Sequence, residues 1–450
     1  MTSKILGSAV ARGATLSLLA AGTLCLSSCD ILDVDNPNNL LEEDVRQAAA
    51  ANAMVNGSLA TVTIAVARAW QPVGVAADEL VWIGSRDAWQ QLDFGALSDP
   101  SNEFVDENFP FLGRGRWMAD EAATILVQHA EKDPSVKMKT DLARAQLFAG
   151  IMYTVLGETQ EDFVFSNKTE AGPPITPAKM HTVLDQAITK LDRAVAVARE
   201  VGNAELETRA LAMRARARHS RAIWDKIKPA PKTSDPLVNA AAAVADAQAV
   251  IGRVTGDWKY QLTFSSSTFG NNMAEWINSR AENQFDTLSV VKVDQKTVKI
   301  IESVRLLDPI TNAPDAVITA KLIEWKSGAI SSAGNVYPPL TLASVRMMRL
   351  ILAEDALQKN NQAEFQTQIN AIRALDDLTP YTGQIPALDM LKHTRRVNLF
   401  LMGLRLNDMY RFGIRDPHWK PNSDAFAKPG TLMPITITEI RANPHLKGDG

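Results

Sequence analysis

The residues with the clearest chemistry lie near the N-terminus, in the sequence Leu26-Ser27-Ser28-Cys29. Small residues directly before a cysteine are typical of a bacterial lipobox, in which the thiol takes a diacylglycerol and the cysteine becomes the first mature residue. We therefore predict that Cys29 carries acyl chains such as palmitate. Because one chain holds a protein only marginally, we expect two or three to form the membrane anchor.

The segment before Cys29 has the features of a secretory signal. Lys4 and Arg12 precede an apolar run at residues 14–26, which is shorter than the ~20 residues that a spanning helix needs. We predict a signal peptide at residues 1–28 and a lipidated polar tether at residues 29–40. The alternative is an ordinary soluble secretory signal with a chance cysteine.

The composition limits the possible classes of protein. The chain has 450 residues, 46% of them hydrophobic, and a formal net charge of −4, which argues against nucleic acid as a partner. Its two cysteines are Cys25 and Cys29, so cysteine catalysis and thiolate metal sites are excluded from the mature chain. No later stretch reaches ~18 uninterrupted apolar residues, so we expect an anchored protein that does not span the membrane.

Catalytic motifs are missing from the sequence. None of the six histidines forms a close metal-binding pair, and Gly113-x-Gly115 lacks the third glycine of a dinucleotide loop. The sequence contains neither a Walker A motif nor Gly-x-Ser-x-Gly. We therefore expect a protein that is not an enzyme and that has no cofactor and no metal site.

Most of the chain has the apolar periodicity of helices. Pro177 opens a helical hairpin that Gly202-Asn203 divides, and this hairpin resembles a tetratricopeptide unit, which must stack on neighbours. The predicted helices cover residues 42–66, 116–130, 137–156, 177–201, 206–227, 237–251, 340–358, 363–375 and 387–412. Loop-rich regions are predicted at residues 70–115 and 256–339. Residues 258–264 alternate and predict a strand, whereas residues 288–293 and 318–325 are either strands or irregular pieces.

The last predicted helix resembles the C-terminal helix of the SusD/RagB family. Seven of its residues fall on the family pattern: Arg395, Arg396, Leu399, Gly403, Arg405, Asp408 and Arg411. Where the family has glutamates, this chain has Thr394, Asn398 and Met402, so the partners of the arginines are left open.

Further segments match the same family in the same order along the chain. They are Ala77-Asp78-Glu79, residues 115–126, Ala353-Glu354, residues 369–373 and residues 432–444. The resemblance implies a mainly α fold over residues 41–450, with tetratricopeptide-like helical pairs and a loop-rich irregular lobe that carries the ligand site.

The resemblance also implies a function. It implies a surface-exposed outer-membrane lipoprotein that binds a nutrient, an oligosaccharide or a peptide, and delivers it to a SusC-like TonB-dependent transporter as its lid. The alternative is a tetratricopeptide-type scaffold lipoprotein that assembles envelope complexes, and a lipid-anchored hydrolase is a third hypothesis. The sequence leaves open the ligand's identity, the binding of calcium and, because Asp30 follows Cys29, which membrane holds the protein.

A glycan site needs aromatic faces with polar neighbours. One short run in the first loop-rich region offers them, and we predict ligand contact for Trp82, Arg86, Asp87, Trp89 and Gln90. Core packing is the alternative for each aromatic residue, and it is the interpretation we favour for Trp117 and Trp224. The basic residues between Arg209 and Lys228 contact either acidic groups of a ligand or lipid, or only solvent.

Overall fold

The computed structural model describes residues 46–293, 297–326 and 335–447. The predicted signal peptide, the tether and Cys29 lie outside these residues, so they stay predictions. Two units are distinguished, residues 1–50 and residues 51–450. The first is described only over residues 46–50, where Ala48–Ala50 form a 3-10 turn (η1).

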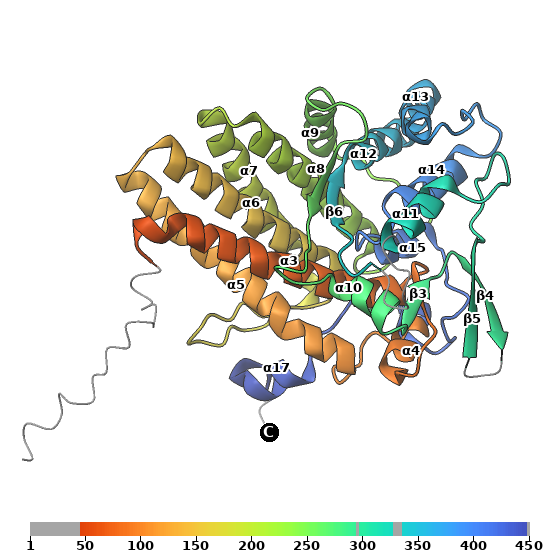
Figure 1. Cartoon of the computed structure of the whole chain (residues 1–450), viewed down its shortest axis with the longest axis horizontal. Coiled ribbons are helices and arrows are strands. Elements are labelled where there is room, and N and C mark those ends of the chain that lie inside the picture. The colour runs from red at the N-terminus through yellow and green to blue at the C-terminus, as the bar shows by residue number, and fades with distance from the viewer. Residues whose placement is uncertain (1–45, 294–296, 327–334, 448–450) are drawn as a thin grey trace, which may run out of the picture. The chain divides into compact units, whose positions relative to one another are not determined.

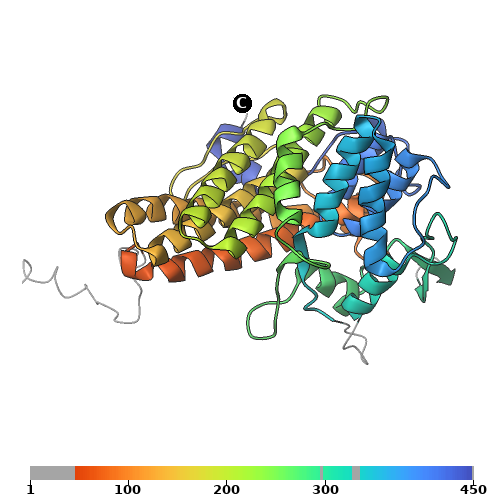
Figure 2. The same ribbon diagram turned by 90° about the horizontal axis from the view of Figure 1, so that it is seen from above.

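The second unit is built on an array of antiparallel helices that pack in chain order. Figure 1 shows the first of them lying side by side, and Figure 2 shows the succession continuing through α8 and α9 to α12 and α13. The array comprises α3 (Ala51–Ala76), α5 (Glu103–Lys132), α6 (Val136–Thr159), α7 (His181–Glu200), α8 (Ala204–Ile227), α9 (Ala241–Ile251), α12 (Val345–Gln358) and α13 (Gln362–Arg373). The predicted mainly α fold with tetratricopeptide-like pairs is confirmed.

Polar side chains cap the N-termini of several of these helices. The side chain of Asn102 accepts hydrogen bonds from Phe104 N and Val105 N at the start of α5, and Ser135 and Asn203 cap α6 and α8 in the same way. Such caps satisfy backbone donors that have no partner inside the helix.

The first helix of the array is long and rich in apolar residues. The stretch Ala48–Ala76 is long and apolar enough to cross a membrane by length and composition alone. However, α3 packs on α5 and α6, and Val62, Val66 and Val73 are at most 1% exposed. This burial is that of a core helix in a helical array.

The remaining elements form the irregular lobe. They are β1 (Leu80–Trp82), α4 (Asp87–Asp93), β2 (Lys259–Leu262), α10 (Asn272–Ala274), the π-helical turn η3 (Glu275–Ser279), β3 (Asn283–Phe285), β4 (Leu288–Val293), β5 (Thr297–Val304), α11 (Ala316–Lys326), β6 (Leu340–Ser344), α14 (Ala387–Asn398) and α15 (Arg405–Phe412). The strands pair as three antiparallel ribbons, β1–β3, β2–β6 and β4–β5. Short turns and helices complete the unit: η2 (Pro177–Lys179), η4 (Ala374–Asp376), α16 (Asp424–Ala427), α17 (Ile437–Ala442) and η5 (Pro444–Leu446).

The prediction of a single helix at residues 387–412 is wrong, because the structure has two helices there, α14 and α15, with a break between them. Between them, Leu401 and Gly403 have left-handed φ angles of 57° and 71°. Leu401 N donates to the buried carboxyl group of Glu79 (2.9 Å), and Gly403 lies directly against the indole ring of Trp70. The break therefore brings the chain against α3 and the segment that follows it.

Other predicted boundaries also change. The loop-rich region predicted at residues 70–115 is narrower, because α3 continues to Ala76 and α5 already begins at Glu103. Residues 340–344 form strand β6 instead of the start of a helix, because they pair with β2. Residues 318–325 are helical in α11, whereas β2 and β4 are strands as predicted.

The arginines of the SusD/RagB pattern find buried carboxylates on other elements. Glu354 of α12 is 0% exposed and pairs with Arg395 of α14 and Arg411 of α15. Asp408 pairs with the same two arginines, with Nε–Oδ distances of 2.8 and 2.9 Å. His219 Nε2 of α8 lies 3.2 Å from Glu354 Oε2. This cluster joins α8 and α12 of the array to α14 and α15 of the lobe around the Glu354 carboxylate.

A second buried set of ion pairs fixes the end of α3. Asp78 accepts two hydrogen bonds from Arg405, at 2.5 and 2.8 Å, and pairs with Arg396 at 3.1 Å. Burial alone would raise the pKa of Asp78, but Arg405 and Arg396 hold it below the ordinary value. Asp78 is therefore a charged partner within the fold.

The basic side chains of α8 are largely paired within the chain. Arg214 and Arg218 both reach Asp246 of α9 and Asp192 of α7. Arg216 is buried against Glu158 of α6 at 2.6 Å. These arginines tie neighbouring helices together, so their role is structural.

Candidate ligand-binding surface

The segment that contains the predicted ligand residues is held by β3, far away in the sequence. Trp82 of β1 pairs with Asn283 of β3. Glu282 then accepts hydrogen bonds from Ser85 N and Arg86 N, both 2.9 Å, at the start of α4. A Cβ atom at Gly84 would collide with the Glu282 side chain, so this close contact requires glycine.

Trp89 lies in the core, which contradicts direct ligand contact through its ring. Its side chain is 0% exposed and stacks on Phe104 with ring centroids 4.0 Å apart. Trp276 of η3 meets it edge-on at 5.6 Å. One face of the short helix α4 must be buried for it to stay folded, and Trp89 supplies that face.

The other four predicted residues are at least partly at the surface. Trp82 and Gln90 are half-buried, whereas Arg86 and Asp87 are exposed. Arg86 pairs with the exposed Glu103 at 3.3 Å, which leaves its guanidinium accessible. Ligand contact stays a prediction for these four residues.

An aromatic hollow of about 480 Å³ lies where β2 meets α3, α6 and α8. Tyr260 is 6% exposed, and the guanidinium carbon of Arg209 lies 5.2 Å from the centroid of its ring. Burial raises the pKa of Tyr260 to about 12, so its hydroxyl is neutral and able to donate a hydrogen bond. The other aromatic and polar lining residues include Phe148, Phe264, Phe269, Gln261, Thr263 and Thr268. Rings beside hydroxyl and amide groups are the chemistry that a sugar requires.

A second hollow of about 440 Å³ lies along α5. It is lined by Trp117, Phe109 and Phe163, with Arg114 at its edge. Trp117 and Trp224 are both half-buried, so the expectation that they are core residues is not met. The spacing along a helix could not reveal this, because it does not show how completely other segments cover a side chain.

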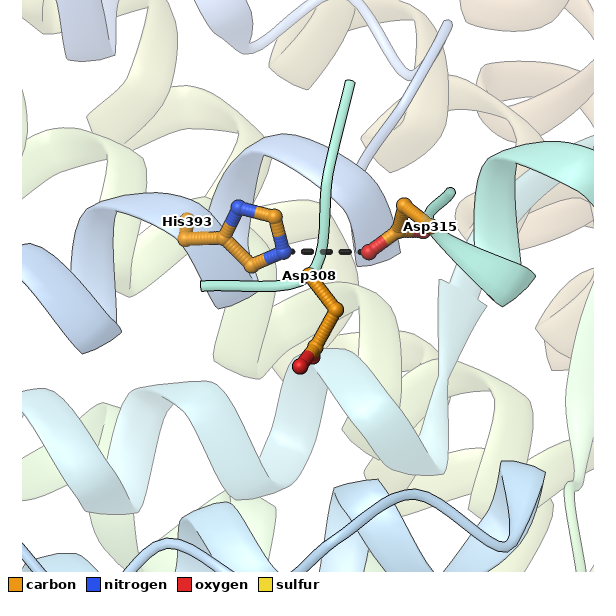
Figure 3. A group of neighbouring side chains, drawn as sticks. All are labelled: Asp308, Asp315 and His393. Carbon is orange, nitrogen blue, oxygen red and sulfur yellow. Dashed lines mark hydrogen bonds and ion pairs between the residues drawn. The ribbon is translucent and has the colours of Figure 1, made fainter. Parts of the chain in front are cut away.

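Among the residues that the structure describes, Asp308, Asp315 and His393 bring their oxygen and nitrogen atoms close enough together to hold a metal ion (Figure 3). His393 Nε2 lies 3.0 Å from Asp315 Oδ2, and Arg373 pairs with Asp308 at 2.9 Å. Burial would raise the pKa of Asp308, but Arg373 and the Thr311 N–H group lower it to about 2. These contacts already occupy the ligand atoms, and they attach the loop before α11 to α13 and α14.

Comparison of this fold with solved structures identifies its class. The chain resembles a SusD homolog from Bacteroides thetaiotaomicron VPI-5482, with a TM-score of 0.62 and 13% identity over 89% of this chain and 97% of the other. A SusD-like carbohydrate-binding protein from Bacteroides fragilis NCTC 9343 gives a TM-score of 0.58 and 12% identity, over 89% and 99% of the two chains. A SusD-like carbohydrate-binding protein from Bacteroides vulgatus ATCC 8482 gives 0.55 and 12%, over 81% and 83%.

The chain therefore has the SusD fold over most of its length. No family model and no curated protein matches the sequence. At such low identity the structural likeness defines the fold, and it confirms the architecture that the sequence resemblance implied.

Proposed function

We propose that this protein is a member of the SusD/RagB family that binds a glycan nutrient at the cell surface without chemical conversion. The observation that carries this proposal is the SusD fold, which covers 83% and 99% of two structures described as carbohydrate-binding proteins. The aromatic hollow at Tyr260 and the exposed polar residues beside Trp82 supply surfaces with suitable chemistry.

The proposal extends to attachment and partner. Acylated Cys29 anchors the protein in the outer membrane, and the tether of residues 29–40 lets it cap a SusC-like TonB-dependent transporter as a lid. The protein then hands the glycan to the transporter. In this mechanism the lipobox supplies the anchor and the fold supplies the binding surface. The protein acts by binding and movement and not by catalysis.

The proposal is tested by capture and binding together. The acylated protein, crosslinked in intact cells and purified from membranes, should bring a barrel transporter with it. Calorimetric titration of the purified lipoprotein against a panel of oligosaccharides should identify at least one ligand. A capture that brings envelope assembly proteins and no barrel, with no bound oligosaccharide, would favour the scaffold function instead.

A matched control tests the anchor. Replacing Cys29 by Ser should release the protein as a soluble form, and fractionation of the unaltered protein should place it in the outer membrane. Recovery in the inner membrane would show that Asp30 acts as a retention signal and would contradict the lid arrangement.

A further inference from the structure

A basic pocket lies between α14, the loop after α15 and the base of the β4–β5 hairpin. It has a volume of about 460 Å³, which lies within the range of small-molecule sites. Two carboxylates line it, Asp78 and Asp286. Five cationic side chains line it as well: Arg305, Lys392, Arg396, Arg405 and Arg415. This excess of positive charge contrasts with the formal net charge of −4 on the whole chain.

The two carboxylates are already engaged with their neighbours. Asp78 is bound by Arg405 and Arg396, as described above, and Arg305 pairs with Asp286 while its Nε donates to Asp286 O at 2.7 Å. Burial raises the pKa of Asp286 to about 7, so it carries only part of its charge at neutral pH. Two carboxylates, one of them only partly charged, face five cationic side chains, so the pocket keeps a net positive charge.

Two of the cations are weakly held by the chain itself. Lys392 Nζ lies 3.5 Å from the exposed Asp389, one turn earlier on α14. Arg415 is exposed, and its guanidinium lies 4.0 Å from the centroid of the Phe426 ring. A long ion pair at the surface and a stacked guanidinium both leave hydrogen-bond donors free for a ligand.

The guanidinium of Arg396 is a further positive group in the pocket that lacks a full set of partners. Its Nε atom is buried and has no hydrogen-bond partner within the described part of the chain. Burial, reinforced by Arg405 and Arg305, lowers its pKa, whereas Asp78 and Asp286 act in the opposite direction. An added negative charge in the pocket would stabilise this guanidinium.

We propose that the basic pocket binds the carboxylate or sulfate group of an acidic sugar residue in the glycan. The inference rests on the proposed function for the glycan, while the positive charges specify the anion. Leu306, Ile414 and Pro417 line the same pocket and give it an apolar side. An apolar side fits the face of a sugar ring better than a bare inorganic anion, and the guanidinium forks match planar or tetrahedral oxyanions.

The test compares galactose-based glycans with and without acidic groups. The purified lipoprotein is titrated with an oligogalacturonate, with a neutral galacto-oligosaccharide of equal length and with its sulfated form. One of the two acidic forms should bind about tenfold or more tightly than the neutral form, and this advantage should shrink at high salt. Which acidic form wins distinguishes carboxylate from sulfate.

Variants locate the binding at the pocket. Arg415→Gln together with Lys392→Gln should remove most of the tenfold advantage and leave the melting temperature unchanged. Lys137→Gln changes an exposed cation at the start of α6 and should have no effect, so it is the matched control. Arg415→Glu is a second variant, and it should weaken acidic binding more than Arg415→Gln alone, because it reverses a charge instead of removing it.

The outcomes separate this inference from the proposed function. Equal binding of acidic and neutral glycans would overturn the basic-pocket inference and leave glycan binding intact. An acidic preference that survives in the pocket variants would also overturn it, since the anion would then lie elsewhere. Failure of every oligosaccharide to bind would overturn both proposals.

Discussion

At the scale of single residues, the motifs that match the SusD/RagB pattern serve the fold. Arg395, Asp408 and Arg411 surround Glu354, and Arg405 binds Asp78, all with side chains at most 9% exposed. Burial would raise the pKa of Glu354, yet Arg411, His219 and Arg395 hold it well below the ordinary value. A buried carboxylate with such partners is a strong constraint on how the elements meet.

Removing Glu354 should therefore destabilise the protein severely. In Glu354→Ala the two buried guanidiniums must share Asp408, so we expect the free energy of unfolding to fall by about 3–5 kcal/mol. Chemical denaturation measures this change. Glu200→Ala breaks the exposed pair with Lys139 and should change the free energy by less than about 1 kcal/mol. Equal effects of the two variants would contradict a central role for Glu354.

The two tryptophans predicted as ligand contacts should now behave differently. Trp89→Ala removes a fully buried ring from its stack on Phe104, so we expect a loss of about 3–5 kcal/mol in unfolding free energy. Trp82→Ala should cost less stability than Trp89→Ala, because Trp82 is only half-buried against the core, and it should weaken glycan binding about fivefold to tenfold. Unchanged glycan affinity in the Trp82 variant would remove that residue from the ligand surface.

The sequence identified the segment that contains Trp82 and Trp89, but it could not show which of the two rings is buried. Both tryptophans lie seven residues apart in one loop-rich segment, and nothing local shows which ring faces inward. The ring of Trp276, almost 190 residues later, covers Trp89 in the structure. The basic pocket was missed for the same reason, because Arg305 and Arg415 meet only through the fold.

At the scale of elements, periodicity predicted the helices well where each one packs on its sequence neighbours. The hairpin of α7 and α8 is an example, because its apolar stripe and its Gly202-Asn203 turn are local signals. Periodicity failed at the junction of α14 and α15. There the apolar pattern runs on through Leu399 and Met402, while contacts with Trp70 and Glu79 break the helix.

This junction predicts an effect for a small substitution. Gly403→Ala places a Cβ atom against the Trp70 ring at a φ of 71°, so we expect a loss of at least about 2 kcal/mol in unfolding free energy. Gly113→Ala is the matched control, because its Cβ would enter open space within α5 and should stabilise that helix by about 0.5–1 kcal/mol. Tolerance of alanine at position 403 would mean that the break is not enforced by Trp70.

At the scale of the molecule, the buried carboxyl groups fall into two kinds with opposite effects on stability. Glu354, Asp78 and Asp408 have lowered pKa values, so the stability they contribute is complete at neutral pH and is lost only in acid. Burial instead raises the pKa of Glu79 to about 8 and that of Asp416 to about 6. These groups bind protons more tightly in the folded chain than in the unfolded one.

The carboxyl groups with raised pKa values predict that the stability of the protein falls as the pH rises. Asp286 and His418, with pKa values raised to about 7 by burial and to about 8 by Asp93, act in the same direction. Buried His219 opposes them, because its pKa lies below 6.5, but its effect ends near that pH. We therefore expect the free energy of unfolding to decrease steadily between about pH 6.5 and 8.

The substitution Glu79→Gln isolates the largest contribution. Because Glu79 is protonated in the folded state at neutral pH, glutamine preserves its shape, its neutral charge and the acceptor for Leu401 N. The slope of unfolding free energy against pH should then become shallower by about 1.4 kcal/mol per pH unit, up to near pH 8. Denaturation across this range measures the slope for both proteins. Parallel curves would show that Glu79 is ionised in the fold, and the left-handed turn at Leu401 would then be held by a buried charge.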